Sequence, residues 1–418
     1  MTRTTNRRSM ICSFNRTPRR LSASVKPANT FPALRGRAFL GRLTASCAGL
    51  TALLVLSASA TAAPKPIETD FDDNRIFIEL PEPALSVTAL PDSPQQLADI
   101  VQSQIVQSRN TGDPRFLGYA EGLLQQWPGE MTARLRVLRA TLKQSLHQFR
   151  EARQELTTVI AETDNPQQRI QARLLLANLE LVQGNYTDAR EHCARLQEAF
   201  PGLVSASCMA QVAARTGNAQ SAYDLLKKQV GSATRQDITG RLWAEGTLGD
   251  IAAQLGKNEA TEHWLAVLGV TPEDLYTRGQ LADWTLERGN HARVLALTDG
   301  YEDVDSLAVI RAIAMKRADH PRADSLISNL RERFAEARWR GTLLHQRDIA
   351  RFQLDVEESP SDALENAVGN WADQREPLDT RLLLRAADAA KDTQQQRAVR
   401  QWLETQEQTD ARYPETSS

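Results

Sequence analysis

The chain has 418 residues, with 50 lysines and arginines against 52 aspartates and glutamates. The first 62 residues hold ten of the basic residues and none of the acidic ones, so the remainder is net acidic. We therefore expect neither nucleic acid nor an anionic lipid surface as a partner, because both require a basic face. Hydrophobic residues make up 41% of the chain, and β-branched residues never alternate over more than a few positions. We therefore expect an all-α protein with a sizeable core.

The first 62 residues have the character of a secretory signal peptide. They contain ten lysines or arginines and no acidic residue, and an apolar stretch at residues 43–56 is followed by Ala60-Thr61-Ala62. A basic region, a short apolar core and a small-x-small site are typical of such a signal. We predict Sec-type export into a periplasm, with cleavage after Ala62. The mature chain would keep 40 basic residues against 52 acidic ones, a net charge near −12.

The apolar stretch also bears on membrane attachment. It is about 14 residues long, shorter than the roughly 20 residues that cross a bilayer as a helix. We expect no stable membrane insertion after cleavage, and an uncleaved anchor is the open alternative. Twin-arginine export and lipidation are disfavoured, because Arg19-Arg20 lies far from the apolar stretch and Cys47 lies inside it.

Residues 63–96 differ from the rest of the chain by their proline content. Six prolines fall between Pro64 and Pro94, a density that excludes a long helix. One short stretch, residues 75–80, alternates apolar and polar side chains. We predict an extended acidic linker whose strand-like stretch packs along the first repeat.

From residue 97 onward a pattern of small residues recurs at a fixed spacing. Nine anchor positions inside successive helices lie 29 to 40 residues apart: Leu117, Ala152, Ala189, Ala222, Thr261, Val294, Ala323, Ala363 and Ala398. Five residues before each anchor we expect a turn, with glycine at Gly112, Gly184, Gly217, Gly256 and Gly289, and with His147, Ala318, Glu358 and Thr393 in the other units. Twelve residues before the anchor another small residue is usual, and Arg311 and Arg351 break that rule.

The spacing resembles the tetratricopeptide repeat (TPR), whose period is about 34 residues. The best match is Ala177, Gly184, Tyr186, Ala189 and Pro201. The resemblance covers residues 97–408 and implies a right-handed α-solenoid of about nine helix-turn-helix hairpins, in which each hairpin buries its apolar face against its neighbours. A looser array of helical hairpins is the alternative. We assign residues 409–418 to a polar tail.

The repeat register implies a position for the two cysteines of the mature chain. It places Cys193 on the second helix of the third unit and Cys208 on the first helix of the fourth, and these helices are neighbours in such a stack. An oxidising compartment would allow a disulfide between them. Two buried thiols are the other interpretation.

Motifs for catalysis and metal binding are missing from the sequence. The six histidines lack the paired spacing of a zinc site, and no nucleophile, phosphate-loop or dinucleotide motif occurs. Asp70-x-Asp72-x-Asn74 imitates the start of a calcium loop, but Arg75 and Pro81 stand where glycine and glutamate are needed. We expect no enzyme, no cofactor and no metal site.

The resemblance to TPR proteins implies a concave groove, lined by the first helix of each unit, that binds an extended protein or peptide. The candidate groove residues are Arg134, Thr141, Gln144, Gln171, Asn178, Gln211, Arg215, Trp243, Asp250, Tyr276 and Asp283. A clamp for a peptide carboxylate is doubtful, because Leu174 stands where that clamp has lysine beside Asn178.

Two hypotheses for function follow. In the first, the chain is an exported scaffold that binds a protein or peptide and assists assembly or regulation of an envelope complex. In the second, Trp243, Tyr276 and the neighbouring acidic residues form a platform that stacks on a glycan of the cell wall.

Overall fold

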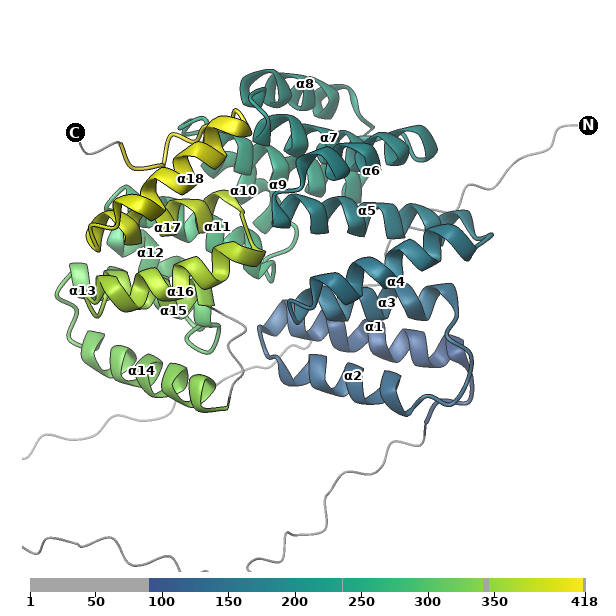
Figure 1. Cartoon of the computed structure of the whole chain (residues 1–418), viewed down its shortest axis with the longest axis horizontal. Helices are drawn as coiled ribbons and strands as arrows, with labels where there is room; N and C mark the ends of the chain where they lie inside the picture. Colours follow the sequence, from purple (N-terminus) through teal and green to yellow (C-terminus); the bar gives the residue numbers. More distant parts are fainter. Residues whose placement is uncertain (1–89, 235, 341–345, 416–418) are drawn as a thin grey trace, which may run out of the picture. The chain divides into compact units, whose positions relative to one another are not determined.

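Eighteen α-helices pair in chain order into hairpins across the residues that the structure describes (Figure 1). The structure is a computed structural model, and it describes residues 90–415 except for 235 and 341–345. The predicted signal peptide and most of the predicted linker lie outside the described residues. All described helices belong to one unit, Val87–Ser418.

The helices have the following bounds. The first five hairpins are α1 (Pro94–Thr111) with α2 (Arg115–Gln126), α3 (Ala133–Ser145) with α4 (Phe149–Glu162), α5 (Pro166–Gln183) with α6 (Tyr186–Ala199), α7 (Leu203–Arg215) with α8 (Ala219–Ser232), and α9 (Ile238–Gln254) with α10 (Ala260–Leu268). The other four are α11 (Leu275–Glu287) with α12 (His291–Leu297), α13 (Asp305–Arg317) with α14 (Ala323–Trp339), α15 (Gln346–Asp355) with α16 (Pro360–Asp373), and α17 (Pro377–Ala389) with α18 (Thr393–Thr405).

The hairpins stack through their first helices. Each odd-numbered helix from α1 to α17 contacts the next odd-numbered helix, so these helices form one continuous row. First helices begin 30 to 41 residues apart, close to the spacing read from the sequence. The described part of the chain is therefore an all-α, TPR-like solenoid, as the repeat pattern predicts. We call the row of first helices the inner face.

The turns within hairpins explain most of the glycine pattern. Five turn glycines have φ between +70° and +81°, where a residue without a Cβ is least strained: Gly112, Gly184, Gly217, Gly256 and Gly289. His147 and Glu358 take the same left-handed conformation at φ 58° and 54°. Two turn positions were predicted wrongly, because Asp319 and Lys391 adopt it in place of Ala318 and Thr393. Ala318 still bonds to the end of α13, and Thr393 is already the first residue of α18.

Seven of the nine anchor positions are buried in the core. Ala152, Ala189 and Ala363 are fully buried, as their spacing predicts. In the fifth and ninth hairpins the register is shifted by one residue: Ala260 and Val399 are fully buried in place of Thr261 and Ala398. A pattern of small residues does not distinguish an alanine from its neighbour when either side chain could fit.

A buried arginine replaces the small residue at one inner position. Arg311 of α13 is 4% exposed. Its guanidinium donates to the carbonyl of Leu295 at 2.8 Å and pairs with Asp299 and Glu302 at 3.0 Å each. Burial of a charge is tolerated here because two carboxylates and a main-chain carbonyl surround the guanidinium.

Cys193 and Cys208 form a disulfide between the third and fourth hairpins. Cys193 lies on α6 and Cys208 on α7, and their Cα atoms are 5.5 Å apart. Both side chains are buried, at 0% and 2% exposure. The bond therefore fastens two successive hairpins from inside their core.

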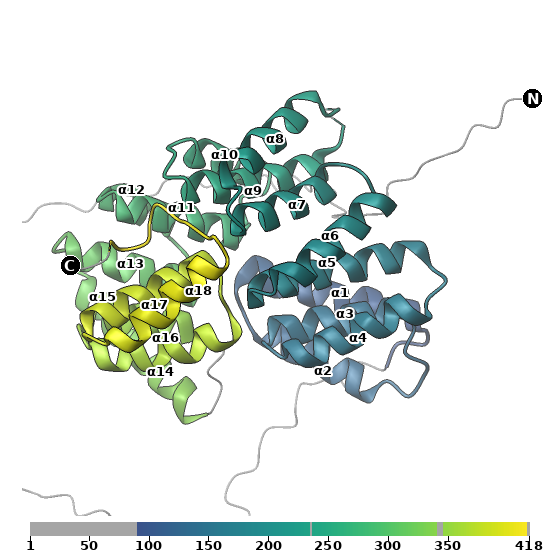
Figure 2. The ribbon, with the colours of Figure 1, turned by 45° about the horizontal axis from the view of Figure 1, so that its top comes forward.

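The last two hairpins pack back onto the third. The amide of Arg375, between α16 and α17, donates to the carbonyl of Val182 in α5 at 2.7 Å. The ring of Trp402 on α18 lies 6.0 Å from that of Tyr186, and a Cβ added to Gly184 would meet it at 2.9 Å. Figures 1 and 2 both show α18 beside the hairpins of the first half. The solenoid therefore curves until hairpins far apart in the sequence touch.

Candidate functional site

The predicted groove residues of the first three hairpins make local contacts. Arg134 of α3 donates to Asp99 of α1 at 2.6 Å and to Gln102 at 2.9 Å. Thr141 is buried, and its hydroxyl donates to the carbonyl of Val137 in its own helix. Three further predicted residues are half-buried on α3 and α5: Gln144, Gln171 and Asn178.

In the fourth and fifth hairpins the predicted residues connect α7 to α9. Gln211 donates to the hydroxyl of Thr247 at 3.1 Å, and Arg215 donates to the side chain of Gln254 at 2.7 Å. These residues therefore brace one hairpin against the next.

Asp250 of α9 forms the centre of a small polar cluster. It accepts hydrogen bonds from the indole of Trp264 at 3.1 Å and from the hydroxyl of Tyr276 at 3.0 Å. Removal from water raises the pKa of Asp250 to about 6, against the opposing effect of Arg215. Tyr276 leaves 52% of its surface exposed, and Trp243 is half-buried. The described residues show no ring contact between Trp243 and Tyr276.

Asp283 of α11, another predicted groove residue, is buried and held by two ion pairs. It is 3% exposed and pairs with Arg381 of α17 at 2.5 Å and with Arg351 of α15 at 2.9 Å. The physical reason is that an unpaired buried carboxylate is costly, so the solenoid closes with two guanidinium groups around it.

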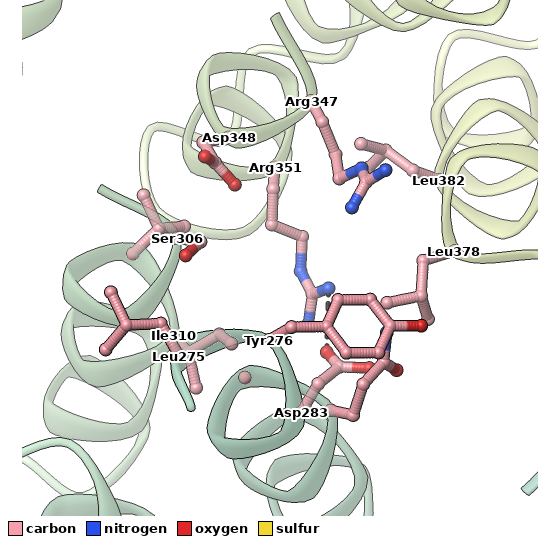
Figure 3. Close-up of a pocket in the computed structure, with 13 residues that line it drawn as sticks. Leu275, Tyr276, Asp283, Ser306, Ile310, Arg347, Asp348, Arg351, Leu378 and Leu382 are labelled. Atoms are coloured by element: carbon pink, nitrogen blue, oxygen red, sulfur yellow. Dashed lines mark ion pairs between the residues drawn. The ribbon is translucent and has the colours of Figure 1, made fainter. Parts of the chain in front are cut away.

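A pocket of about 110 Å³ opens on the inner face of the last four hairpins (Figure 3). It lies among α11, α13, α15 and α17. The apolar part of its wall consists of Leu275, Val309, Ile310, Leu378 and Leu382, with Gly279 beside them. Polar side chains complete the lining: Tyr276, Gln280, Asp283, Ser306, Arg347, Asp348 and Arg351.

The charges around this pocket are largely balanced by ion pairs. Arg347 donates to Asp379 at 2.5 Å and to Glu376 at 2.7 Å, while Arg351 reaches Asp283 and Asp355. Figure 3 shows the Arg351 guanidinium extended toward Asp283 beside the ring of Tyr276. With the guanidinium groups already matched by carboxylates, the pocket offers apolar space rather than a site for an anion.

The pocket contains residues that were not predicted from the sequence. Arg347, Leu378 and Leu382 carry no motif, and they meet α11 only because the solenoid curves. One signal was present, because Arg351 interrupts the row of small residues. A charged residue at a position where other repeats have a small one can indicate that the neighbouring buried space is polar.

A hydrogen-bonded chain of titratable groups joins α8, α9 and α10. The hydroxyl of Tyr223 lies 3.0 Å from Nε2 of His263, whose Nδ1 lies 2.7 Å from a carboxylate oxygen of Glu245. Both ring nitrogens are satisfied, so the chain braces three helices.

The described residues contain neither a cluster suited to a metal ion nor a helix suited to spanning a membrane. No group of three or more histidine, cysteine, aspartate or glutamate side chains is placed to hold a metal ion. No helix in that part of the chain is long and apolar enough to cross a membrane.

No family model matches the sequence, and no curated protein matches it. A crystal structure of the TPR domain of P58(IPK) matches with 13% sequence identity over 73% of this chain and 90% of that chain. The TM-score of this match is 0.20, so the two structures do not superpose as whole bodies.

Proposed function

We propose that this chain is an exported, periplasmic scaffold that binds an extended segment of a protein partner on its inner face. In this proposal one apolar side chain of the partner enters the pocket among α11, α13, α15 and α17, and binding assists assembly or regulation of an envelope complex. The observation that carries the proposal is that pocket, which combines an apolar wall with polar groups at its edge.

The size of the pocket favours a side chain over a small molecule. Sites for cofactors and metabolites usually enclose about 300 Å³ or more. The volume here is about 110 Å³. Extended peptides bind through main-chain hydrogen bonds, with single side chains inserted in pockets. Gln280 and Ser306 can supply such hydrogen bonds from the pocket lining.

Two observations support the exported location. The N-terminal sequence has the basic and apolar regions of a signal peptide. The disulfide between Cys193 and Cys208 is a bond that forms in oxidising compartments and is rare in the cytosol.

A glycine in the pocket allows a direct test. A Cβ added to Gly279 would meet only Leu307, at 4.0 Å, so a larger side chain can grow into the pocket. Gly279→Leu should therefore fill the binding space, and replacing a helical glycine should not weaken the helix. Gly118→Leu is the matched control, because it is a helical glycine on α2 with no atom within 4 Å of an added Cβ.

The experiment captures partners from envelope extract with wild-type chain, Gly279→Leu and Gly118→Leu. The proposal predicts a partner that binds wild type and Gly118→Leu but is lost with Gly279→Leu. Equal capture by all three chains would exclude the pocket as the binding site. Sedimentation of all three with purified cell wall, without any captured protein, would favour the glycan platform.

A further inference from the structure

The last described residues lie across the turns of the third to fifth hairpins. We call residues 406–415, which follow α18, the C-terminal strap. A Cβ added to Gly217 would meet the Glu407 carboxylate at 2.9 Å, and one added to Gly256 would meet Ala411 at 3.0 Å. The strap therefore packs closely against two of the glycine turns.

Gln254 at the end of α9 binds the main chain of the strap on both sides. The side-chain amide of Gln254 donates to the main-chain carbonyl of Thr409 at 2.8 Å. The main-chain carbonyl of Gln254 accepts from the main-chain amide of Ala411, also at 2.8 Å. The hydrogen bond from Arg215 fixes the orientation of the Gln254 side chain. Gln254 thus offers one donor and one acceptor to the main chain of the strap. Recognition of an extended peptide uses main-chain hydrogen bonds of this kind.

A second contact joins Tyr186 to the side chain of Gln408 in the strap. The hydroxyl of Tyr186 donates to the side-chain oxygen of Gln408 at 2.9 Å, and the amide of Gln408 donates to the hydroxyl of Tyr413 at 2.8 Å. Tyr186 and Gln408 are both buried, at 3% and 4% exposure. This position therefore selects a carboxamide, because its loss would leave a buried hydroxyl without a partner.

The strap is held by hydrogen bonds more than by apolar burial. Gln408 and Asp410 are buried, while Thr409 and Ala411 between and beside them are exposed. Tyr413 is the one large ring of the strap, and it lies half-buried against the core cluster of the last two hairpins. Segments with few buried apolar contacts open at low free energy relative to global unfolding.

We propose that the surface formed by Tyr186, Gln254 and the turn at Gly256 is a peptide-binding site that the C-terminal strap fills within the same chain. Its external ligand is an extended peptide with a glutamine followed three residues later by a small residue, as in Gln408 and Ala411. The proposal rests on the proposed function, because it adds a second contact for a protein partner and a means of regulating it.

The strap limits this site by competition. A segment tethered directly to α18 acts at an effective concentration on the order of millimolar. The apparent affinity of an external peptide is then its intrinsic affinity reduced by the fraction of chains in which the site is open. A change that loosens the strap without altering the site should therefore tighten binding of the external peptide.

The test measures binding of a fluorescent peptide of residues 405–415 to the full chain by anisotropy. Ala411→Pro removes the amide that donates to Gln254 and leaves the receptor residues intact. We expect this variant to bind the peptide at least about tenfold more tightly than wild type. Tyr186→Phe in the same variant should weaken binding by about two- to tenfold, the effect of one hydrogen bond. A peptide in which Gln408 is replaced by alanine is the matched control.

Equally weak binding by wild type and a folded Ala411→Pro variant would overturn the proposal and make the strap a permanent clasp. Hydrogen exchange of the Ala411 amide in the wild-type chain decides the case if that variant fails to fold. Exchange much faster than that of the helix amides supports a displaceable strap, and exchange only with global unfolding overturns it. Gly279→Leu should leave peptide binding unchanged, so failure at the pocket and failure at the strap can be told apart.

Discussion

Two arginine–aspartate pairs of similar length have very different surroundings in the two halves of the repeat array. Arg134 of α3 meets Asp99 of α1 at 2.6 Å, with side chains that are 36% and 69% exposed. Arg381 of α17 meets Asp283 of α11 at 2.5 Å, with side chains that are 2% and 5% exposed. The ionic groups are the same, but water surrounds the first pair and protein surrounds the second.

The difference follows from which hairpins each pair joins. Asp99 and Arg134 belong to successive hairpins, which are neighbours in any stack of this kind. Asp283 and Arg381 are 98 positions apart and belong to the sixth and ninth hairpins. They meet only because the inner face curves around a shared interior. In this comparison the pair between successive hairpins remains exposed to water, whereas the pair that closes the curve is buried on both sides.

Removal of one partner of the buried pair should give the largest effect. Asp283→Ala leaves the Arg381 guanidinium buried without its carboxylate, and we expect a loss of about 3–5 kcal/mol in the free energy of unfolding. Urea denaturation measures it. The double variant Asp283→Leu/Arg381→Leu should recover most of the loss, because no isolated charge remains. A loss below about 1 kcal/mol in the single variant would contradict the importance of burial in this comparison.

The disulfide joins successive hairpins in the first half, and its removal should have the next largest effect. Cys193 and Cys208 are 15 residues apart, and a loop of that size gives about 3 kcal/mol in the chain-entropy model. Unfolding of the wild-type chain should therefore shift to lower urea when a thiol reductant is present during denaturation. The variant Cys193→Ala/Cys208→Ala should be insensitive to the reductant. An equal response of both chains would contradict this account.

Two inner-face carboxylates should respond to pH in opposite directions. Burial raises the pKa of Asp250 to about 6, so the folded chain holds this proton more tightly than the unfolded chain does. Burial acts in the same direction on Asp283, but Arg381 and Arg351 hold its pKa well below the ordinary value. Asp250 therefore lowers stability as the pH rises from about 4 to about 6, while the contribution of Asp283 is present above about pH 4 and lost as the pH falls.

Asp250→Asn tests the first of these two effects. Over that pH range the wild-type chain should lose about 2 kcal/mol that the variant does not lose. The measurement is the free energy of unfolding by urea at several pH values for both chains. Parallel pH profiles of the two chains would show that Asp250 titrates as an ordinary carboxyl group.

The exposed pair should give the smallest effect. Arg134→Ala removes an ion pair that water already screens, and we expect a loss below about 1 kcal/mol. The same urea measurement at low and high salt should show that the loss shrinks as salt is added. A loss as large as that of Asp283→Ala would remove the distinction between the two halves.

Local chemistry was enough to predict the hairpins. Gly184 and Ala189 have the roles that their spacing indicates, because a left-handed turn and a close contact between two helices depend on neighbours a few residues away. The same rules failed by one or two residues where no glycine marks the turn, as at Asp319 and Lys391. Several polar residues tolerate the left-handed conformation at moderate cost, so sequence does not single one out.

The candidate site was less accessible to sequence reasoning. Tyr276 was correctly placed on the inner face, but Arg347 and Leu382 line the same pocket without any motif. Asp283 was predicted to bind a ligand because a carboxylate on a first helix can point into the groove. In the structure it is held by two arginines. Its two arginines come from α15 and α17, and nothing in the sequence around Asp283 indicates them.

The sequence by itself determined the repeating unit of this protein: its period, its turns, the faces that each hairpin buries and the absence of known catalytic motifs. These features depend on residues within one hairpin or the next. The tertiary structure alone decided how far the array curves, and thereby which hairpins meet, where the pocket opens and what the strap covers. Small rotations between successive hairpins add up along a solenoid, so contacts between distant hairpins depend on all of them together.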